Sequence, residues 1–384
     1  MQVGIVGSGA MGSGIAQVVA TAGDEVRLFD ANPARLSLVL PELEKNLSRL
    51  VEKGKLAKED ATKIVKRVST VTSLAHFKDC DLIVEAIVED LAAKQSVFSE
   101  LEKVIRQDAV LATNTSSLSI ASIGARCVHP ERVVGIHFFN PAPLMQLVEI
   151  VPSLQTSAEL VAKVSEWVKG WSKLPVVAKD TPGFIVNRIA RPFYGEALRI
   201  LEEGIADAPT IDWAMKHFGG FRMGPFELMD FIGHDVNYAV TESVFAAFYF
   251  DPRYRPSLTQ KRLVEANLLG RKTGRGFYDY RDGAVNPSPR EDEGLGSTIF
   301  HRIISMLINE ATEALHLQIA TRDDIDLAMT KGVNYPKGLL KWADELGMDI
   351  VFRELTSLCE DYAEDRYRPS VKLRRMARDG AYFY

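Results

Sequence analysis

Two side chains suited to acid–base chemistry stand in one segment, RVVGIHFFNPAPLMQLVEI, residues 132–150. His137 ends an apolar run, and Glu149 lies inside a second run after a proline-bearing turn, so the two could pair across neighbouring strands. Histidine, with an unperturbed pKa of about 6.5, suits the removal of a hydroxyl proton while hydride leaves the same carbon. A carboxylate on its other ring nitrogen would fix the tautomer. The spacing alone leaves a second interpretation open, because a histidine beside Phe138 and Phe139 is commonly structural.

A glycine-rich turn follows the first apolar run and opens a helical stretch. It consists of Gly7, Ser8, Gly9, Ala10, Met11 and Gly12. In this pattern the first glycine permits the turn, the second lets pyrophosphate approach the backbone, and the third allows close helix packing. Asp30 lies eighteen residues beyond Gly12, at the end of the second predicted strand. Its carboxylate would accept the ribose hydroxyls and repel a 2′-phosphate, which favours NAD over NADP. The alternative is an ordinary glycine turn with a surface aspartate.

These residues have to be positioned by a sheet, and β-rich runs recur through the first half of the chain. The predicted strands are the opening residues and segments 26–29, 68–71, 82–85, 110–112 and 133–136. Helical segments such as 91–105 separate them, which predicts an α/β Rossmann-type domain with a mostly parallel, doubly wound sheet over residues 1–182. Segment 35–67 is charged and favours helix. We expect it to form a helical pair that is inserted between the second and third strands and projects from the sheet.

From residue 183 onward β-rich runs are scarce, which predicts an all-α second part. Within it an ungapped offset of 114 aligns Arg188 with Arg302, together with several other positions, so the helical unit is duplicated. The other aligned pairs include Glu196 with Glu310, Asp212 with Asp326, and Asp230 with Asp344. Residues 281–297, rich in Gly, Pro, Ser and charge, are typical of a linker. We therefore expect helical domains at 183–280 and 298–384.

The composition narrows the classes of function. The 384 residues carry 46 Lys plus Arg against 51 Asp plus Glu, a net charge of -5, which disfavours disorder and nucleic-acid binding. Cys80, Cys127 and Cys359 are far apart and fit neither a disulfide framework nor a metal site. The sequence has no signal-peptide pattern and no apolar run of about 18 residues that would span a membrane. We expect a soluble, cytoplasmic protein with no metal and no membrane partner.

Several longer motifs occur in a fixed order along the first 280 residues. They are NTSSL at 114–118, GIHFFNPAPLM at 135–145, DTPGFIVNR at 180–188 and GPFEL at 224–228, with VEAIVED at 84–90 and GRKTGRGFYDY at 270–280. On these motifs and the glycine turn the chain closely resembles the L-3-hydroxyacyl-CoA dehydrogenase family. The resemblance implies NAD-dependent oxidation of a 3-hydroxyacyl-CoA thioester, in β-oxidation or related CoA-thioester catabolism.

The resemblance also implies catalytic roles for four residues. His137 would be the general base, oriented by Glu149, while Ser116 would bond the substrate oxygen and Asn187 would help to hold the acyl group. Taken without the family pattern, both are ordinary polar residues, and the favoured interpretations are a helix cap before Leu118 for Ser116 and a solvated helical residue for Asn187.

Further cofactor and substrate contacts follow from the same resemblance. The implied NAD contacts beyond the glycine turn and Asp30 are Glu89, Lys94, Ser116, Asn140 and Lys272. From the residues alone, Glu89 and Lys94 would be a loop acid and a solvated helix residue. The implied CoA contacts are Ser116 and, in the helical insertion, Lys53 and Asn46, where relatives often have serine. A basic row of Arg49, Lys53, Lys55 and Lys58 would neutralise CoA phosphates, although such a row is also typical of a solvated helix face.

The second helical copy departs from the first at positions that matter for chemistry. It has His301 where the first copy has Asn187, and no second glycine turn precedes it. Shorter members of the family dimerise through their single helical domain, so the second copy is interpreted as a structural, built-in partner. The chain is then expected to be a monomer or a homodimer.

Two rival functions share part of this pattern. A dehydrogenase of a free 3-hydroxy acid would share the sheet but need no CoA, and an NAD-sensing binding protein would be expected to lack the His and Glu of the motif. Segment 235–260 and the duplication also resemble dehydrogenases of 3-hydroxyadipyl-CoA. A substrate of that kind ends in a carboxylate, for which Arg191 and Arg222 are the candidate partners.

Overall fold

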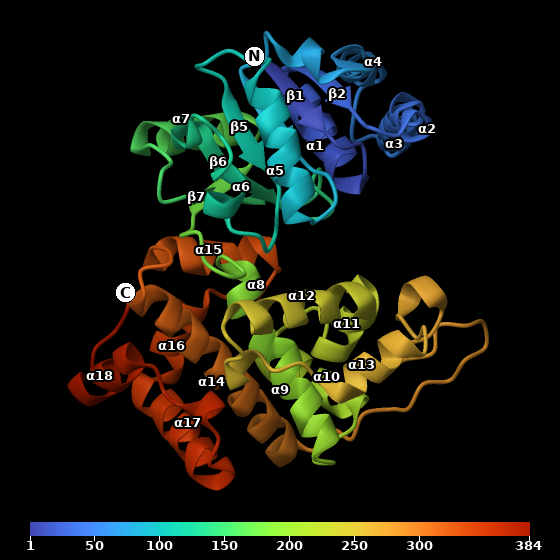
Figure 1. The fold of residues 1–384 in the computed structure, drawn as a ribbon. Helices are drawn as coiled ribbons and strands as arrows, with labels where there is room; N and C mark the ends of the chain where they lie inside the picture. Colours follow the sequence, from blue (N-terminus) through green and yellow to red (C-terminus); the bar gives the residue numbers. More distant parts are fainter. The chain divides into compact units, whose positions relative to one another are not determined.

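The structure is a computed structural model that describes residues 1–384. It divides into two compact units, Met1–Phe184 and Ile185–Tyr384. Figure 1 shows a sheet flanked by helices in the first unit and helices in the second. The predicted class, an α/β Rossmann-type unit followed by an all-α unit, is confirmed.

Eight strands form one sheet in the order β3-β2-β1-β4-β5-β6-β7-β8. The strands are β1 Gln2–Val6, β2 Glu25–Phe29, β3 Val68–Val71, β4 Leu82–Glu85, β5 Val110–Thr113, β6 Val133–Phe138, β7 Leu147–Pro152 and β8 Leu174–Val177. All pairs are parallel except β6 with β7, which are antiparallel. The strand order reverses between β1 and β4, and in such sheets ligands bind at the carboxyl ends of the strands beside the reversal.

Strand β8 is absent from the sequence-based prediction. It is four residues long and contains Pro175, which weakens a strand signal because proline donates no hydrogen bond. In the structure β8 pairs with β7 alone, as an edge strand, a place where proline is tolerated.

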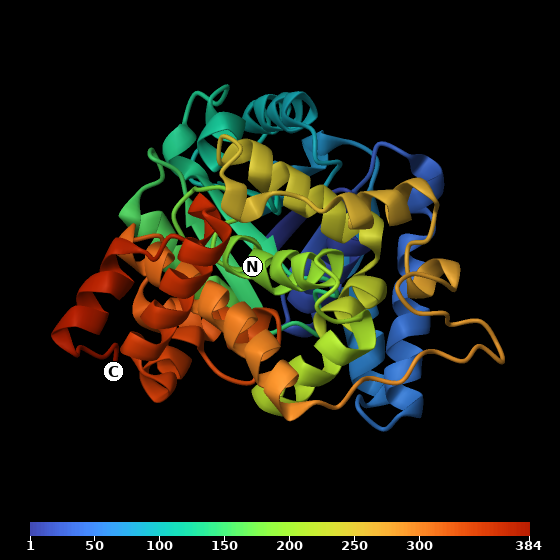
Figure 2. The same ribbon diagram turned by 90° about the horizontal axis from the view of Figure 1, so that it is seen from below.

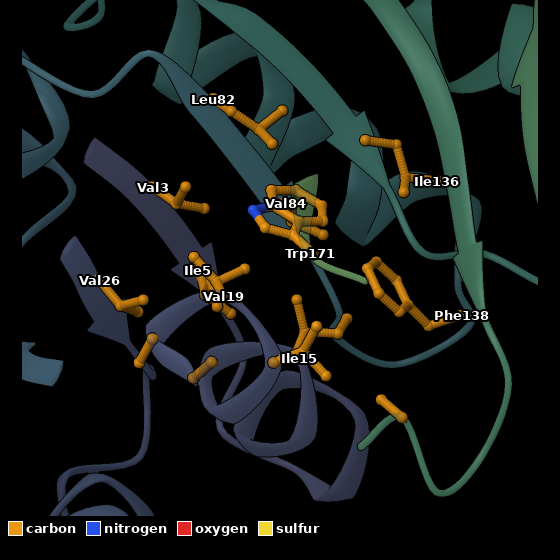
Figure 3. Packing of buried hydrophobic residues seen from close by; sticks show 14 of the residues in the cluster. Val3, Ile5, Ile15, Val19, Val26, Leu82, Val84, Ile136, Phe138 and Trp171 are labelled. Carbon is orange, nitrogen blue, oxygen red and sulfur yellow. The ribbon is translucent and has the colours of Figure 1, made fainter. Parts of the chain in front are cut away.

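The two faces of the sheet carry different side chains because strand residues alternate. The helices of this unit are α1 Ala10–Thr21, α2 Pro33–Leu36, α3 Val39–Glu52, α4 Lys58–Lys66, α5 Leu91–Glu102, α6 Ile120–Gly124 and α7 Ala158–Gly170, with single turns η1 Leu74–Phe77 and η2 Pro130–Arg132. On one face the apolar strand residues pack with α1 and with Trp171, which follows α7 (Figure 3). The labelled core residues are Val3, Ile5, Ile15, Val19, Val26, Leu82, Val84, Ile136, Phe138 and Trp171.

Helices α2 to α4 form the predicted insertion between β2 and β3. Val39, Leu43 and Leu47 are buried in the same core cluster, and Ile64 of α4 joins them. Their four-residue spacing on α3 makes one apolar stripe, and α3 and α4 contact α1. That stripe therefore holds the helical pair along α1.

The second unit contains eleven helices and three further single turns. They are α8 Val186–Ile189, α9 Arg191–Glu202, α10 Ala208–Gly219, α11 Pro225–Ile232, α12 His234–Ala247, η3 Pro252–Tyr254, α13 Leu258–Glu265, η4 Arg271–Thr273, α14 Glu293–His316, α15 Arg322–Gly332, α16 Leu339–Leu346, α17 Met348–Tyr362, η5 Asp365–Tyr367 and α18 Val371–Asp379. Helices α10 to α12 correspond to α15 to α17 at the predicted offset of 114, and η3 and α13 correspond to η5 and α18 at an offset of 113. The duplication is thus visible element by element.

One buried aspartate in each copy organises the same local structure. Asp212 accepts hydrogen bonds from the backbone N–H groups of Phe226 and Glu227, at 2.9 Å each, and from the Tyr278 hydroxyl at 2.7 Å. Asp326 accepts the equivalent bonds at the start of α16 from Leu340 and Lys341, at 2.8 and 3.0 Å, and from the Tyr384 hydroxyl at 3.0 Å. The second copy has therefore kept its scaffold.

The segment between the copies is shorter than the sequence predicts. Residues 281–292 contain no helix or strand and run as an extended, mostly exposed loop before α14 (Figure 2). Residues 293–297, predicted as linker, belong to α14, because Asp292 caps the helix by accepting from the Leu295 N–H. Gly296 is required there since a Cβ would lie 2.5 Å from the Trp213 ring.

No helix of the structure is both long enough and apolar enough to cross a membrane.

Candidate active site

The glycine turn joins β1 to α1 at the carboxyl edge of the sheet. Gly7 has a φ of 103°, and a Cβ there would lie 2.4 Å from the Ala86 carbonyl oxygen. A Cβ on Gly12 would lie 1.8 Å from the Gly7 oxygen, so this glycine allows the helix to start against the turn. At Gly9 a Cβ would meet nothing nearer than the Arg35 guanidinium at 3.9 Å. The turn is thus closed on its inner side and open at Gly9, where a pyrophosphate needs to approach.

Asp30 follows β2 and is tied to the turn. Its Oδ2 accepts from the N–H and the hydroxyl of Ser8, both at 2.7 Å, and its Oδ1 accepts from the Asn32 N–H at 2.8 Å. Burial alone would raise the pKa of Asp30, but these bonds and the Arg35 charge outweigh it and lower the pKa. The ionised carboxylate suits a ribose diol, so the turn and Asp30 together fit NAD. Arg35 was missed because it lies five residues beyond Asp30.

The NTSSL loop is organised by Glu89. One oxygen of this carboxylate accepts from the Thr115 hydroxyl at 2.5 Å, from the Ser116 N–H at 3.0 Å and from the Ser117 hydroxyl at 2.9 Å. The other oxygen lies 3.2 Å from the Lys94 ammonium. Burial would raise the pKa of Glu89, but Lys94 and the loop donors lower it. Glu89 therefore fixes the loop while leaving the Ser116 hydroxyl without a partner in the protein.

Lys94 is 1% exposed, which differs from the solvated residue suggested by its position in a helix. Its ammonium lies 2.7 Å from the buried Glu85 carboxylate, which also accepts from the Thr113 hydroxyl at 2.7 Å. Glu85 and Thr113 end β4 and β5. A buried ion pair of this kind links two strand ends to the Glu89 loop, and neither Glu85 nor Thr113 carried a sequence signal for it.

His137 and Glu149 are directly opposite each other on antiparallel strands β6 and β7. The His137 Nδ1 lies 2.7 Å from the Glu149 Oε2, and the two residues are 5% and 0% exposed. The cross-strand pairing expected from the sequence is confirmed. Because a carboxylate only accepts, Nδ1 carries the proton and Nε2 keeps its lone pair for a base. The rings of Phe139 and Phe184, with centroids 4.5 and 5.8 Å from that of His137, complete an apolar surround.

The segment after His137 is held from two sides. The Asn114 side-chain oxygen accepts from the Phe138 N–H at 2.8 Å, which ties the end of β6 to the NTSSL loop. The Lys173 ammonium donates to the carbonyl oxygens of Ala142 and Met145, both at 2.7 Å, and so closes the turn. Asn140 lies exposed between these anchors. Asn114 and Lys173 were not predicted, because a side chain that bonds to backbone leaves no spacing pattern.

The candidate CoA contacts lie on the polar side of the insertion. Asn46 is exposed on α3, and Lys53 is the exposed residue that caps its C-terminal end. Arg49, Lys55 and Lys58 are also exposed, and none of the four basic side chains forms an ion pair in the structure. They remain free to meet an anion.

Two implied site residues belong to the helical unit. Asn187 is half-buried on α8, and its carbonyl oxygen accepts from the Arg191 Nε at 3.0 Å. The half-exposed Lys272 ammonium is paired with the Asp235 carboxylate. Lys272 is thus partnered within its own unit, a relationship that the spacing of residues 235 and 272 did not reveal.

Comparison with known proteins agrees with these observations. The family model for the 3-hydroxyacyl-CoA dehydrogenase NAD binding domain matches residues 2–181, and that for the C-terminal domain matches residues 183–280 and 299–382. The chain is 38% identical to 3-hydroxyadipyl-CoA dehydrogenase of Escherichia coli, over 98% of this chain and 97% of the relative. It is 43% identical to 3-hydroxybutyryl-CoA dehydrogenase of Clostridioides difficile, over 73% of this chain and 99% of the relative.

Solved structures extend the comparison. The crystal structure of 3-hydroxybutyryl-CoA dehydrogenase from Escherichia coli matches with a TM-score of 0.91 and 36% identity, and the match covers 98% of each chain. The two family models together match most of this chain. The same chain contains the dinucleotide turn, the paired His and Glu, and the duplicated helical unit. The chain belongs to the 3-hydroxyacyl-CoA dehydrogenase family.

Proposed function

We propose that this protein oxidises L-3-hydroxyacyl-CoA thioesters to 3-oxoacyl-CoA, with His137 as the general base. The observation that carries the proposal is the buried His137–Glu149 pair, at 2.7 Å, on the sheet that also carries the dinucleotide turn. β1, β4, β5 and β6 are parallel, so Gly7, Thr113 and His137 lie toward the same carboxyl edge. Base and cofactor turn therefore share one edge.

Side chains of the protein account for the removal of the C3 hydroxyl proton. When bound, NAD⁺ supplies the acceptor for the hydride that leaves C3. The His137 Nε2 takes the C3 hydroxyl proton, and the Glu149 carboxylate stabilises the imidazolium that results. The Ser116 hydroxyl, which has no partner in the protein, would donate to the substrate oxygen. Asn187 would hold the acyl group.

We assign the binding of the CoA portion of the substrate to the helical insertion, α2 to α4. Lys53 and its basic neighbours are exposed and unpaired, and phosphates of CoA are the anions that such ammonium groups bind. Asn46 lies on the same helix. We assign Lys94 and Glu89 to the positioning of the NTSSL loop beside the cofactor, since Lys94 is buried between two carboxylates.

The test is NADH formation from L-3-hydroxybutyryl-CoA, with free 3-hydroxybutyrate as the matched substrate that lacks CoA. We expect turnover of the thioester alone, and faster turnover with NAD⁺ than with NADP⁺. Oxidation of the free acid at an equal rate would instead favour the rival free-acid dehydrogenase. No turnover of either substrate would contradict the proposal.

We also propose that the second helical copy serves the first as an internal partner. The observation that favours this role is a pair of reciprocal buried ion pairs, Arg188 with Glu310 at 2.6 Å and Arg302 with Glu196 at 2.7 Å. Equivalent residues exchange partners across a two-fold interface in just this way. Light scattering of the intact chain tests it, since a dimer that dissociates on deletion of residues 293–384 would show that the second copy joins separate chains instead.

A further inference from the structure

A pocket of about 360 Å³ opens in the first unit, away from the candidate active site. Its walls are the C-terminal end of α5 and the segments that precede β5 and β6. Because β1, β4, β5 and β6 are parallel, these segments lie at the amino edge of the sheet, opposite the edge that carries the dinucleotide turn. The polar residues that line this amino-edge pocket include Ser99, Glu102, Lys103, Arg126, His129 and Arg132. Its volume falls in the range of small-ligand sites, roughly 300–1,000 Å³.

Arg132 is a buried cation of the amino-edge pocket, and its hydrogen bonds are incomplete. It is 8% exposed. Its Nη1 donates to the carbonyl oxygens of Arg106 and Gln107 at 2.7 and 3.1 Å, and its Nη2 donates to the Glu102 Oε1 at 3.2 Å. The buried Nε has no hydrogen-bond partner. A buried charged donor without an acceptor costs free energy, and an anion bound in the pocket would reduce that cost.

Glu102 is the only carboxylate among the lining residues, and its oxygens are already in use. Its Oε2 accepts from the Val128 N–H at 2.6 Å, and its Oε1 accepts from the His129 N–H at 2.9 Å and from Arg132. Burial would raise the pKa of Glu102, but these hydrogen bonds lower it, so the carboxylate stays ionised. The exposed Glu131 lies 3.1 Å from the His129 ring nitrogen and does not line the pocket. Glu102 therefore contributes one negative charge, which already holds the loop before β6.

Two further cations line the pocket without a partner. Lys103 is the residue that caps the C-terminal end of α5, and Arg126 lies in the loop before β6. Both are exposed, and neither side chain forms an ion pair or a hydrogen bond in the structure. The helix dipole favours a lysine at the end of α5, but it does not account for Arg126. With Arg132 there are three cations against Glu102, which leaves an excess of two positive charges when His129 is neutral.

We propose that the amino-edge pocket binds a phosphate dianion, either free phosphate or the terminal phosphate of a small ester. A phosphate monoester carries about −1.5 to −2 charges at pH 7, which matches the excess positive charge, whereas one carboxylate would balance half of it. Three terminal oxygens suit three cations, Lys103, Arg126 and Arg132, and the Ser99 hydroxyl adds a neutral donor. Because the pocket and the dinucleotide turn lie at opposite edges of the sheet, this inference does not depend on the proposed function.

Isothermal titration calorimetry of the full chain tests the proposal. Saturating NADH keeps the dinucleotide turn filled, and the ionic strength is held constant. The probes are glycerol 3-phosphate and inorganic phosphate, with acetate as the singly charged control. We expect a Kd below about 1 mM for at least one phosphate probe, and binding of acetate at least about tenfold weaker. The tighter of the two phosphate probes shows whether the ligand is an ester or the free ion.

Variants place the binding in the pocket. Lys103→Ala combined with Arg126→Ala should raise the Kd of the tighter phosphate probe about 5- to 30-fold. Arg132→Lys keeps the charge but removes the Nε donor, and should raise it about tenfold. Because Arg132 also fastens the loop after α5, the double variant at the two exposed positions is the decisive one. Lys66→Ala combined with Lys78→Ala, at two exposed lysines of the same unit outside the pocket, should leave the Kd unchanged.

Three results would overturn the proposal. The first is no binding of either phosphate probe to the wild-type protein at millimolar concentration. The second is acetate binding as tightly as the phosphates, because a site with two excess charges should distinguish them. The third is an equal loss of affinity in the pocket double variant and in the control double variant, which would show that general surface charge is responsible.

Discussion

The Arg188 guanidinium lies 2.6 Å from the Glu310 carboxylate, with 3% and 2% of the two side chains exposed. Arg302 lies 114 positions after Arg188, and Glu196 lies 114 positions before Glu310. These two residues form the equivalent ion pair, at 2.7 Å. The sequence RYRPS occurs in each copy. Its tyrosine donates a hydrogen bond to one of these glutamates, Tyr254 to Glu310 and Tyr367 to Glu196. One arrangement is thus built twice, with the partners exchanged between the two copies.

Breaking one of these buried pairs should be costly. Arg188→Met leaves Glu310 charged and buried with part of its compensation gone, and such changes typically cost about 3–5 kcal/mol. Unfolding in denaturant, followed by circular dichroism, measures the effect. Arg378→Met, which removes an exposed arginine paired with Asp379, is the matched control and should cost less than about 1 kcal/mol. Similar losses in both variants would contradict the buried role of the Arg188 pair.

Replacing the base should stop the chemistry without releasing the cofactor. We expect His137→Gln to lower kcat by a factor of about 10² to 10⁴, because this is the usual contribution of general-base catalysis. The affinity for NADH, measured by fluorescence titration, should stay within about twofold of the wild-type value. His129→Gln alters an exposed histidine of the same unit and should leave kcat unchanged. Wild-type turnover in His137→Gln would remove this residue from the mechanism.

Asp30 should contribute to cofactor binding alone. Asp30→Asn keeps the size of the side chain but loses the charge that makes hydrogen bonds to ribose hydroxyls strong. We expect the KM for NAD⁺ to rise roughly 10- to 100-fold, which corresponds to the loss of a charged hydrogen bond. The KM for acyl-CoA should stay the same in steady-state assays. An equal rise in both constants would mean that the substitution disturbs the whole turn.

The exposed basic residues of the insertion should contribute to binding of the CoA group. Lys53→Ala should raise the KM for acyl-CoA roughly two- to fivefold, since a solvent-exposed ammonium contributes about 0.5–1 kcal/mol. The KM for NAD⁺ should not change. Lys63→Ala removes a lysine of α4 that is already paired with Asp60, and is the control. If Lys63→Ala has the same effect as Lys53→Ala, general surface charge and not a specific contact is responsible.

Stability should depend on pH through Asp212. Burial raises the pKa of this carboxyl from 3.8 to about 7, against the opposing effect of its hydrogen bonds with Tyr278 and Phe226. Between about pH 4 and 7 the folded protein keeps this proton and the unfolded chain has lost it, so the contribution of Asp212 to stability falls as the pH rises.

Denaturant unfolding at several pH values tests this dependence. The wild-type protein should lose stability relative to Asp212→Asn between pH 4 and 7. Asp279→Asn is the control, because the pKa of Asp279 is about 2 and lies below this window. Parallel pH curves for the wild-type protein and Asp212→Asn would show that Asp212 is ionised throughout.

The sequence predicted the parts of this molecule whose signals are local or periodic. The glycine turn, the β1 to β6 strands and the His137–Glu149 pairing follow from alternation and spacing, and the duplication follows from self-similarity. The buried carboxylate network around Lys94 does not, because Glu85 and Thr113 meet it only when parallel strands place their ends together. Arg191 lies three residues after the DTPGFIVNR motif. Its hydrogen bonds to Asn187, Asn237 and Thr241 become visible only in the folded chain.

The two halves of the reciprocal interface are covalently joined by the loop at residues 281–292. In an interface between separate chains, dilution shifts the equilibrium toward free subunits. Here the effective concentration of one half at the other is set by the connecting chain and does not depend on how much protein is present. The Arg188–Glu310 and Arg302–Glu196 contacts should therefore persist at any cellular abundance of the protein.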